Sequence, residues 1–335
     1  MKRSARGSTS RERLCLWGAL AAMASALACG SRYGYNYLDP TAPRYGSTQE
    51  RAGDRRFDGR IKLVTFNIKF GQRDRVEKAV AYLQSEPRFR DPDVLLLQEM
   101  SCDGVEAIAD ALGANWVYYP AAWHPQGAQW GRPASKHCPA SRAPVTGGSF
   151  GVGIVTPWTI RDDQKILLPQ LSRSDDAQKI ALAATIDFAG AYRIRVVDVH
   201  LQSGLTPVQL GDQAQVIARC VFEERCPAGA TPVAVETWAD EKSDGTPGNV
   251  VLAGDFNTGG EAQLQVLEAL LAPRQDVRLG TPTFWLLGLL APGRGRLDHV
   301  FYGAGLTPGE PHVGTIKISD HRPVMVEFSV VRQKR

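Results

Sequence analysis

Five short motifs of this chain carry polar side chains whose types suit the chemistry of phosphate and metal ions. They are TFNIKFG at 65–71, LLLQE at 95–99, VVDVHL at 196–201, GDFN at 254–257 and SDHRP at 319–323, with the polar residues Asn67, Glu99, His200, Asp255, Asn257, Asp320 and His321. Each motif adjoins an apolar, β-branched run typical of a buried strand, where a polar group is costly unless it binds another one, a metal or a substrate. The set is rich in oxygen, with two His and no Cys, and therefore suits a hard divalent cation and a phosphate better than zinc.

Hydrolysis of a phosphoester requires neutralised non-bridging oxygens, a water aligned opposite the leaving group and a stabilised leaving oxygen. Glu99 is the candidate metal ligand, because a lone carboxylate after a buried strand is otherwise unpaired. We expect Gly254 to let the backbone turn sharply, so that Asp255 can accept a proton from the attacking water and Asn257 can donate to the developing charge. The alternatives are a surface acid for Glu99 and strand-to-turn capping for the other two residues.

A scaffold of alternating strands and helices must position these residues, and the apolar periodicity predicts one from Ile61 onward. The expected strands are 61–67, 93–98, 150–156, 180–188, 192–200 and 250–255, and the expected helices are 74–86, 207–224 and 261–272. We expect a hairpin through Ala189-Gly190.

Three segments lack such periodicity. Segments 121–149 and 227–249 have the composition of surface loops, and segment 29–60, rich in Gly, Tyr, Arg and Pro, indicates a tether or an irregular tail. The domain itself is therefore expected to span 61–335.

The composition indicates one large domain without an electrostatic footprint for long duplex DNA. Of 335 residues, 43% are hydrophobic, which is enough for the core of a single α/β unit. The net charge of +4 is carried by residues 1–28, which hold five Lys or Arg against one Glu. Residues 29–60 add six Arg against four acids, and this leaves residues 61–335 near −2.

Residues 1–28 have the plan of a signal peptide: a basic region to Arg13, an apolar run from Leu14 to Leu27 and small residues before Cys29. The apolar run is too short to span a bilayer stably. The segment before Cys29 fits a lipobox and also offers an A-x-A cleavage site, and we favour lipidation at Cys29 because it explains an otherwise odd cysteine. We expect a periplasmic or outer-membrane lipoprotein, or a secreted protein.

The four cysteines of the domain are expected to form two disulfides, because an exported protein meets an oxidising compartment. The preferred pairing joins Cys102 to Cys138 and Cys220 to Cys226. The sharper alternative is a zinc site of Cys102, Cys138, His137 and His124, although this spacing fits no standard zinc pattern.

The five motifs, together with LDHVF at 297–301, resemble in order and spacing the endonuclease/exonuclease/phosphatase superfamily. That superfamily includes deoxyribonuclease I, AP endonucleases of the exonuclease III type, inositol polyphosphate 5-phosphatases and bacterial sphingomyelinases. The resemblance covers about residues 61–330. It implies a four-layer α/β sandwich, in which two packed, mixed β-sheets are flanked by helices and the active site lies at strand ends where the sheets meet.

The resemblance also implies roles for the polar residues. Glu99 binds Mg²⁺ or Mn²⁺ with Asn67 in support, and Asp320 lies near the metal. His321 contacts the phosphate while Asp298 orients it, and His200 takes the place of a second phosphate-binding or acid imidazole. His299 and His312 have no such support and are expected to be structural.

We therefore expect an exported, divalent-metal-dependent phosphoesterase that acts as a monomer, with a nuclease-type phosphodiesterase as the default by family frequency. The near-neutral charge favours a phospholipid or inositol phosphate as the competing substrate, and a catalytically silent binding domain is the remaining alternative. Lys69 and Arg322 either hold a second substrate phosphate or are solvated charges. The leaving group and the number of metal ions stay open.

Overall fold

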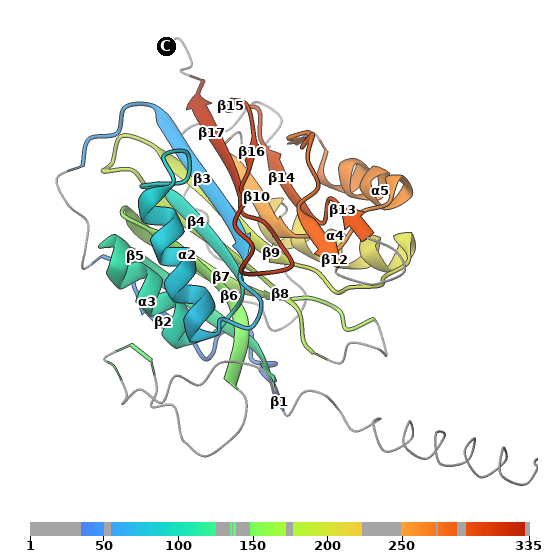
Figure 1. Ribbon diagram of the computed structural model, residues 1–335. Helices are drawn as coiled ribbons and strands as arrows, with labels where there is room; N and C mark the ends of the chain where they lie inside the picture. The colour runs from blue at the N-terminus through green and yellow to red at the C-terminus, as the bar shows by residue number, and fades with distance from the viewer. Residues whose placement is uncertain are drawn as a thin grey trace, which may run out of the picture. The chain divides into compact units, whose positions relative to one another are not determined.

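Runs of aliphatic and β-branched residues form two mixed β-sheets, sheet I and sheet II, which pack face to face (Figure 1). The computed structural model describes residues 35–49, 55–124, 135, 137–138, 148–171, 177–222, 249–272, 274–286 and 293–331. The expected signal peptide, residues 1–28, and Cys29 lie outside the described residues. The chain from Tyr33 to Arg335 is one unit by its internal contacts.

Sheet I consists of β1 (Tyr35–Asn36), β2 (Tyr45–Ser47), β3 (Arg60–Asn67), β4 (Val94–Met100), β5 (Asn115–His124), β6 (Gly148–Thr156), β15 (Leu306–Pro308), β16 (His312–Val313) and β17 (Val324–Val330). Sheet II consists of β7 (Thr159–Leu167), β8 (Ile180–Asp187), β9 (Arg193–His200), β10 (Val250–Asp255), β11 (Gln275–Asp276) and β14 (Asp298–Tyr302). A separate ribbon pairs β12 (Phe284–Leu286) with β13 (Gly293–Gly295). The helices are α2 (Arg73–Ser85), α3 (Cys102–Leu112), α4 (Pro207–Phe222) and α5 (Glu261–Leu271).

Each sheet contains one parallel pair among antiparallel strands, β3 with β4 in sheet I and β9 with β10 in sheet II. Sheet I runs β1-β5-β6-β4-β3-β17-β15, and sheet II runs β11-β14-β10-β9-β8-β7. The two parallel pairs lie inside their sheets, so their carboxyl ends are flanked by protein on both sides.

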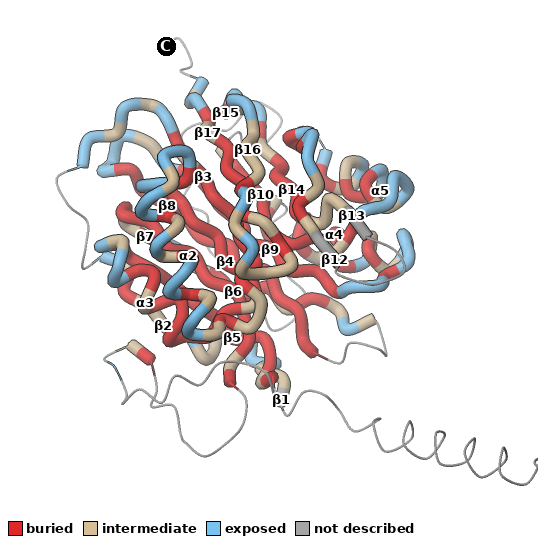
Figure 2. Tube along the Cα trace, viewed as in Figure 1, coloured by how far each residue is buried: buried red, intermediate tan, exposed pale blue. Residues whose placement is uncertain are grey.

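Three apolar clusters fill the spaces between four layers. One lies between the sheets, where Leu96 of β4 packs in the same cluster as Val196 of β9 and Val251 of β10. A second joins α2 and α3 to the outer face of sheet I, and a third joins α4 and α5 to the outer face of sheet II. Figure 2 shows the sheets largely buried and the exposed residues concentrated on the helices and loops. The four-layer α/β sandwich is thereby confirmed.

The strands and helices expected from the sequence are confirmed to within two residues at each end. The β8–β9 hairpin is confirmed too, because Ala189 and Gly190 both have positive φ, +55° and +73°, as a tight turn between twisted strands requires.

Several elements were not expected, chiefly α3, β5, β7, β14 and β17. In β5 the pairing with β6 shifts between Pro120 and Ala122, and in β7 it shifts between Arg161 and Gln164. A bulge inserts an extra residue and breaks the alternation on which strand prediction depends. The expected loop 121–149 was therefore wrong at both ends, because 121–124 belong to β5 and 148–149 to β6. Segment 227–249 lies almost wholly outside the described residues.

The expected tail 29–60 is not irregular throughout, since its strands β1 and β2 pair with β5. Two side-chain contacts fix this segment. The ammonium of Lys165 donates to the carbonyl oxygens of Tyr37 and Asp39 at 2.6 and 3.0 Å, and Arg44 forms an ion pair with Asp163. The domain thus begins before Ile61, because strand pairing with distant residues orders a segment that has no periodicity of its own.

Cys102 and Cys138 form the expected disulfide, with an S–S distance of 2.06 Å. This bond excludes the alternative in which both thiols bind zinc. Cys226 lies outside the described residues, so its pairing with Cys220 stays a prediction. Among the described residues, no helix is both long and apolar enough to cross a membrane.

Candidate active site

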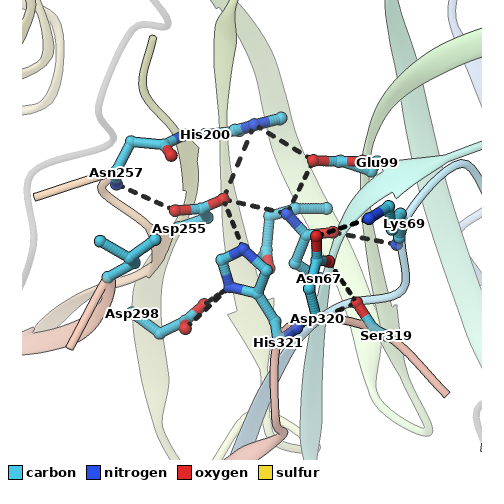
Figure 3. Close-up of polar contacts among 12 residues, drawn as sticks. Asn67, Lys69, Glu99, His200, Asp255, Asn257, Asp298, Ser319, Asp320 and His321 are labelled. Carbon is cyan, nitrogen blue, oxygen red and sulfur yellow. Dashed lines mark hydrogen bonds and ion pairs between the residues drawn. The ribbon is translucent and has the colours of Figure 1, made fainter. Parts of the chain in front are cut away.

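Polar strand ends from both sheets meet at one edge of the sandwich (Figure 3). In sheet II, Asp255 is the register partner of His200 on one side and of Asp298 on the other. This row exists because the parallel strands β9 and β10 end at the edge where the antiparallel β14 begins. The edge brings together six of the predicted residues, Asn67, Glu99, His200, Asp255, Asp298 and His321.

Asp255 is the centre of the site and links the two sheets. Its Oδ2 accepts a hydrogen bond of 2.9 Å from Nδ2 of Asn67 in sheet I. Its Oδ1 accepts a hydrogen bond of 2.9 Å from the backbone amide of Asn257. Nε2 of His321 lies 3.5 Å from Oδ2, and Nε2 of His200 lies 3.8 Å from it. The carboxylate is therefore held at both oxygens and faces two imidazoles.

Glu99 reaches the site through a β-bulge. Leu97 and Met100 both pack in the helix-side cluster, and between them Gln98 and Glu99 stand opposite one residue of β6. Regular alternation would send Glu99 toward the helices, but its φ of +57° turns it to the side of Asp255. Oε1 of Glu99 accepts a bond of 3.1 Å from Asn67, and 18% of its side chain is exposed. The backbone strain at Glu99 thus accompanies its entry into the site.

Gly254 was expected to make a sharp turn, and this was wrong. It lies inside β10, and a Cβ at this position would stand 2.1 Å from the carbonyl oxygen of Val199 on β9. Its φ of +143° is also unfavourable for other residues. Gly254 therefore allows close strand approach, and the turn comes at Asn257, with φ +50°.

His321 is a buried imidazolium between two carboxylates. Its Nδ1 lies 3.0 Å from Oδ2 of Asp298, as expected for an orienting carboxylate, and its Nε2 faces Asp255. Burial alone would lower the pKa of His321, but Asp298, Asp255 and Glu99 outweigh burial and raise it to about 10. At neutral pH both ring nitrogens therefore carry protons.

His200 has the opposite charge preference. Burial, then the positive charges of Lys179 and His321, hold the pKa of His200 well below its ordinary value. Nζ of Lys179 lies 3.5 Å from Nε2 of His200 and also 5.0 Å from the centre of the Phe150 ring. A neutral His200 can accept a hydrogen bond at Nε2, so this geometry favours an accepting role over that of an acid.

The pKa of Asp255 is raised to about 6 by burial and by the charges of Asp298 and Glu99, with His321 and the Asn257 amide acting in the lowering direction. A carboxylate with this pKa is still mostly ionised at pH 7 and is a stronger base than an exposed Asp. Asp255 is therefore suited to accept a proton from water.

Three predicted residues make other contacts. Asp320 forms an ion pair of 2.6 Å with Lys69. Asp320 belongs to neither of the two clusters of possible metal ligands that contain Asp255. Burial would raise the pKa of Asp320, but the bond from Lys69 and the charge of His321 lower it. Nδ2 of Asn257 donates to the carbonyl oxygen of Leu201 at 2.8 Å. The metal role of Asp320, the phosphate roles of Lys69 and Arg322 and the donor role of Asn257 stay predictions.

A hard divalent cation fits the donor set at Glu99. Ligand atoms of Glu99, His200 and Asp255 lie within 4.8 Å of one another, and those of Asp255, Asp298 and His321 form a second such group. The second group already holds a proton-bearing imidazolium, whereas the first presents a partly exposed carboxylate. Among these donors, those of Glu99, with Asn67 beside it, therefore suit a hard cation best.

The sequence did not point to Lys179, Asp198 or Phe150, although all three lie at or under this edge. Lys179 is buried beside His200, and Asp198 is buried two residues before it. An acid inside the apolar run VVDVH was a usable signal, because such a residue is expensive to bury without donors around it. Lys179 precedes its strand in an ordinary polar segment and carried no such signal.

His299 and His312 lie outside the reacting cluster, as expected. Nδ1 of His299 lies 3.4 Å from Oδ2 of Asp276, and its Nε2 lies 3.1 Å from the carbonyl oxygen of Arg296. His312 contacts Arg88 at 2.9 Å on the surface. Both contacts tie neighbouring segments together.

The profile of the Endonuclease/Exonuclease/phosphatase family matches residues 64–321 of this chain. A UPF0294 protein of Vibrio cholerae is 38% identical over 96 residues, which cover 28% of this chain and 31% of that protein. A UPF0294 protein of Vibrio vulnificus is 33% identical over 98 residues. The chain thus spans less than a third of the length of these curated relatives.

Solved structures share the fold at low identity. The crystal structure of D. rerio TDP2 complexed with single strand DNA product has a TM-score of 0.55 and 17% identity, and the match covers 82% of this chain and 100% of that one. The human Nocturnin catalytic domain with bound sulfate anion has a TM-score of 0.54 and 15% identity, with 88% and 100% covered. These likenesses show the fold alone.

Proposed function

The chain belongs to the endonuclease/exonuclease/phosphatase family, and from this premise we propose that it is a divalent-metal-dependent phosphodiesterase. The observation that carries the proposal is the arrangement of Asp255 between a protonated His321 and a partly exposed Glu99. A base, a fixed positive charge and an oxygen ligand for a cation are the three groups that hydrolysis of a phosphoester needs.

Asp255 accepts the proton of the attacking water as the new P–O bond forms and the bond from phosphorus to the leaving oxygen breaks. Asn67 and the amide of Asn257 hold its carboxylate in place at 2.9 Å each. His321, kept charged by Asp298, directs its Nε2–H toward the same space and stabilises the negative charge of the phosphoryl oxygens. Glu99 and Asn67 would hold a divalent cation, which when bound would supply further positive charge to the phosphoryl and leaving oxygens.

His200 contributes as a neutral imidazole. Because Nε2 lies 3.5 Å from the Lys179 ammonium, the ring is held as the tautomer that accepts at Nε2. His200 thereby keeps the Lys179 ammonium beside the site, and the leaving oxygen takes its proton from solvent water.

We propose a small or single-stranded phosphodiester as the substrate. The support is the charge near −2 of residues 61–335, which offers no long basic track. A phospholipid or inositol phosphate is the competing substrate on the same ground.

The test is hydrolysis by the purified protein of single- and double-stranded DNA, RNA, sphingomyelin and inositol phosphates, with Mg²⁺ or with excess EDTA. We expect Mg²⁺-dependent cleavage, reduced by about 10³-fold or more in Asp255→Asn and in His321→Ala. Asp212→Asn on the exposed face of α4 and His312→Ala are matched controls that should keep full turnover. Near-normal turnover of Asp255→Asn would show that another group activates the water.

We also propose export as a lipoprotein, supported by the plan of residues 1–28 and by Cys29. The wild type should incorporate a radioactive fatty acid and fractionate with membranes, and Cys29→Ser should be released. Unchanged membrane association of Cys29→Ser, or unlabelled wild type, would instead support cleavage after Ala28 and a secreted product.

A further inference from the structure

The bulge that brings Glu99 into the site needs an explanation, because it opens the hydrogen-bond ladder between β4 and β6. The pairing is regular up to Leu97 opposite Gly153 and resumes only at Met100 opposite Gly151. A buried backbone amide without an acceptor is costly, so an opened ladder inside a protein requires replacement acceptors.

Asp198, which comes from the other sheet, supplies such an acceptor. Its side chain is fully buried, and its Oδ2 accepts a hydrogen bond of 3.2 Å from the amide of Leu97, the last regular residue before the bulge. The amide of Gly153, opposite Leu97 on β6, also stabilises the Asp198 carboxylate. Asp198 therefore serves both strands at the point where their ladder opens.

Asp198 also holds the first residue of the bulge by its side chain. Nε2 of Gln98 lies 2.5 Å from Oδ1 of Asp198 and 3.0 Å from Oγ1 of Thr65 on β3. The chain of contacts runs from β9 through Gln98 to β3, across the space between the sheets. Burial raises the pKa of Asp198 well above its ordinary value, yet Oδ2 can accept from Leu97 in either protonation state.

In the part of the chain that the structure describes, the side-chain hydrogen bonds of Asp198 go to Leu97 and Gln98 at the bulge and to no group of the proposed reaction. We propose that Asp198 is a positioning residue that stabilises the bulge of β4 and thereby holds the Glu99 carboxylate in the site. The inference deepens the proposed metal-dependent function and rests on it. The position of the proposed metal ligand Glu99 on sheet I thus depends on a hydrogen-bond acceptor, Asp198, on sheet II.

The test compares variants that keep or remove the acceptor. Asp198→Ala removes the acceptor. Asp198→Asn keeps an oxygen that can accept from the amide of Leu97, and its NH₂ group can donate to Gln98 once the Gln98 side-chain amide is flipped. Gln98→Leu removes the opposite end of the same contact and carries the test if Asp198→Ala is not recovered folded. Val196→Ala is the matched control, because Val196 lies two residues earlier on β9 and packs between the sheets.

The readout is the affinity for Mn²⁺ alone, measured by calorimetric titration, with the melting temperature measured in parallel. We expect Asp198→Ala to weaken Mn²⁺ binding by about 10-fold or more, the scale of losing a group that orients a metal ligand. Asp198→Asn and Val196→Ala should stay within about twofold of the wild type, although Val196→Ala lowers the melting temperature by creating a cavity.

Each result decides something. Wild-type affinity in both Asp198→Ala and Gln98→Leu would overturn the inference while leaving the proposed function intact. An equal loss of Mn²⁺ affinity in Asp198→Asn and Asp198→Ala would show that an accepting oxygen at position 198 is not what stabilises the bulge. A wild type that binds no Mn²⁺ would instead contradict the metal-dependent function from which the inference starts.

Discussion

The two histidines of the site carry different charges because their neighbours come from different segments. His321 is enclosed by Asp255 and Asp298, whereas the nearest charged group to Nε2 of His200 is the ammonium of Lys179. Burial lowers the pKa of both rings. The carboxylates outweigh burial at His321, whereas the Lys179 ammonium adds to it at His200. The chain thus uses one imidazole as a cation and the other as an acceptor.

This charge distribution predicts a bell-shaped dependence of kcat/KM on pH. Activity should fall as the pH drops through about 6, where Asp255 takes up a proton and ceases to be a base. It should fall again as the pH rises through about 10, because His321 has a raised pKa and is charged only below that value. In Asp298→Asn the alkaline limb should move to lower pH while the acid limb does not rise. An alkaline limb that stays in place would show that His321 does not depend on Asp298.

Glu99→Gln should weaken binding of the metal ion severely without loss of the fold. The carboxamide keeps the size of the side chain but not its negative charge, which binds a hard cation. We expect the Mg²⁺ concentration for half-maximal turnover to rise by about 10-fold or more, with an unchanged far-ultraviolet spectrum. Glu77→Gln, on the exposed face of α2, is the control. Equal Mg²⁺ dependence in both variants would place the cation elsewhere.

At the scale of elements, the site depends on how closely strand ends approach one another. β9 and β10 run so near each other at Gly254 that no side chain fits between them. This proximity sets His200 beside Asp255 in register. Sheet I adds the bulge of β4, which redirects one side chain. The close approach of β9 to β10 and the bulge of β4 are therefore the two local features that bring the polar side chains together.

Gly254→Ala should destabilise the domain by roughly 3 kcal/mol or more, because the new methyl group would overlap the Val199 carbonyl and force the strands apart. Activity should fall with it, since Asp255 and His200 would separate. Gly190→Ala is the matched control: its φ of +73° is strained for Ala, but nothing lies near the new Cβ. The control should cost about 1 kcal/mol, and denaturant unfolding measures both. Equal costs would mean that the strand approach at Gly254 can relax.

At the scale of the whole molecule, packing of two sheets places each half of the site on a different layer. Asn67 and Glu99 belong to sheet I, and His200, Asp255 and Asp298 belong to sheet II. The apolar cluster between the sheets, which includes Leu96 and Val196, holds them in contact.

The charge of the molecule predicts how it binds a polyanion. Each phosphate neutralised by a protein cation adds nearly one unit to the slope of log affinity against log salt. With residues 61–335 near −2, we expect a slope of about two to three contacts for any DNA substrate, and a preference for short or single strands. Binding measured between low and physiological salt tests this. A slope typical of six or more phosphate contacts would instead indicate a nuclease that acts on duplex DNA.

The sequence by itself determined six of the strands, three of the helices and most of the polar residues of the site. Apolar alternation is a local property, and it located β3, β4, β9 and β10 to within two residues. The polar residues next to these runs, Asn67, Glu99, His200 and Asp255, could be recognised because such groups are costly there without partners. Irregular strands could not be recognised from the sequence. In β5, for example, Pro120 marks a bulge at which the alternation of apolar and polar residues breaks.

Only the tertiary structure decided which groups face one another and in which charge state. That Glu99 turns toward Asp255, that Gly254 allows close approach and that Lys179 lies beside His200 are contacts between residues far apart in the chain. The strands β1 and β2 likewise form only because β5 offers them an edge. Periodicity reports each residue's preference for a core or for water, whereas electrostatic and hydrogen-bond partners are set by packing, and packing joins segments that no local pattern connects.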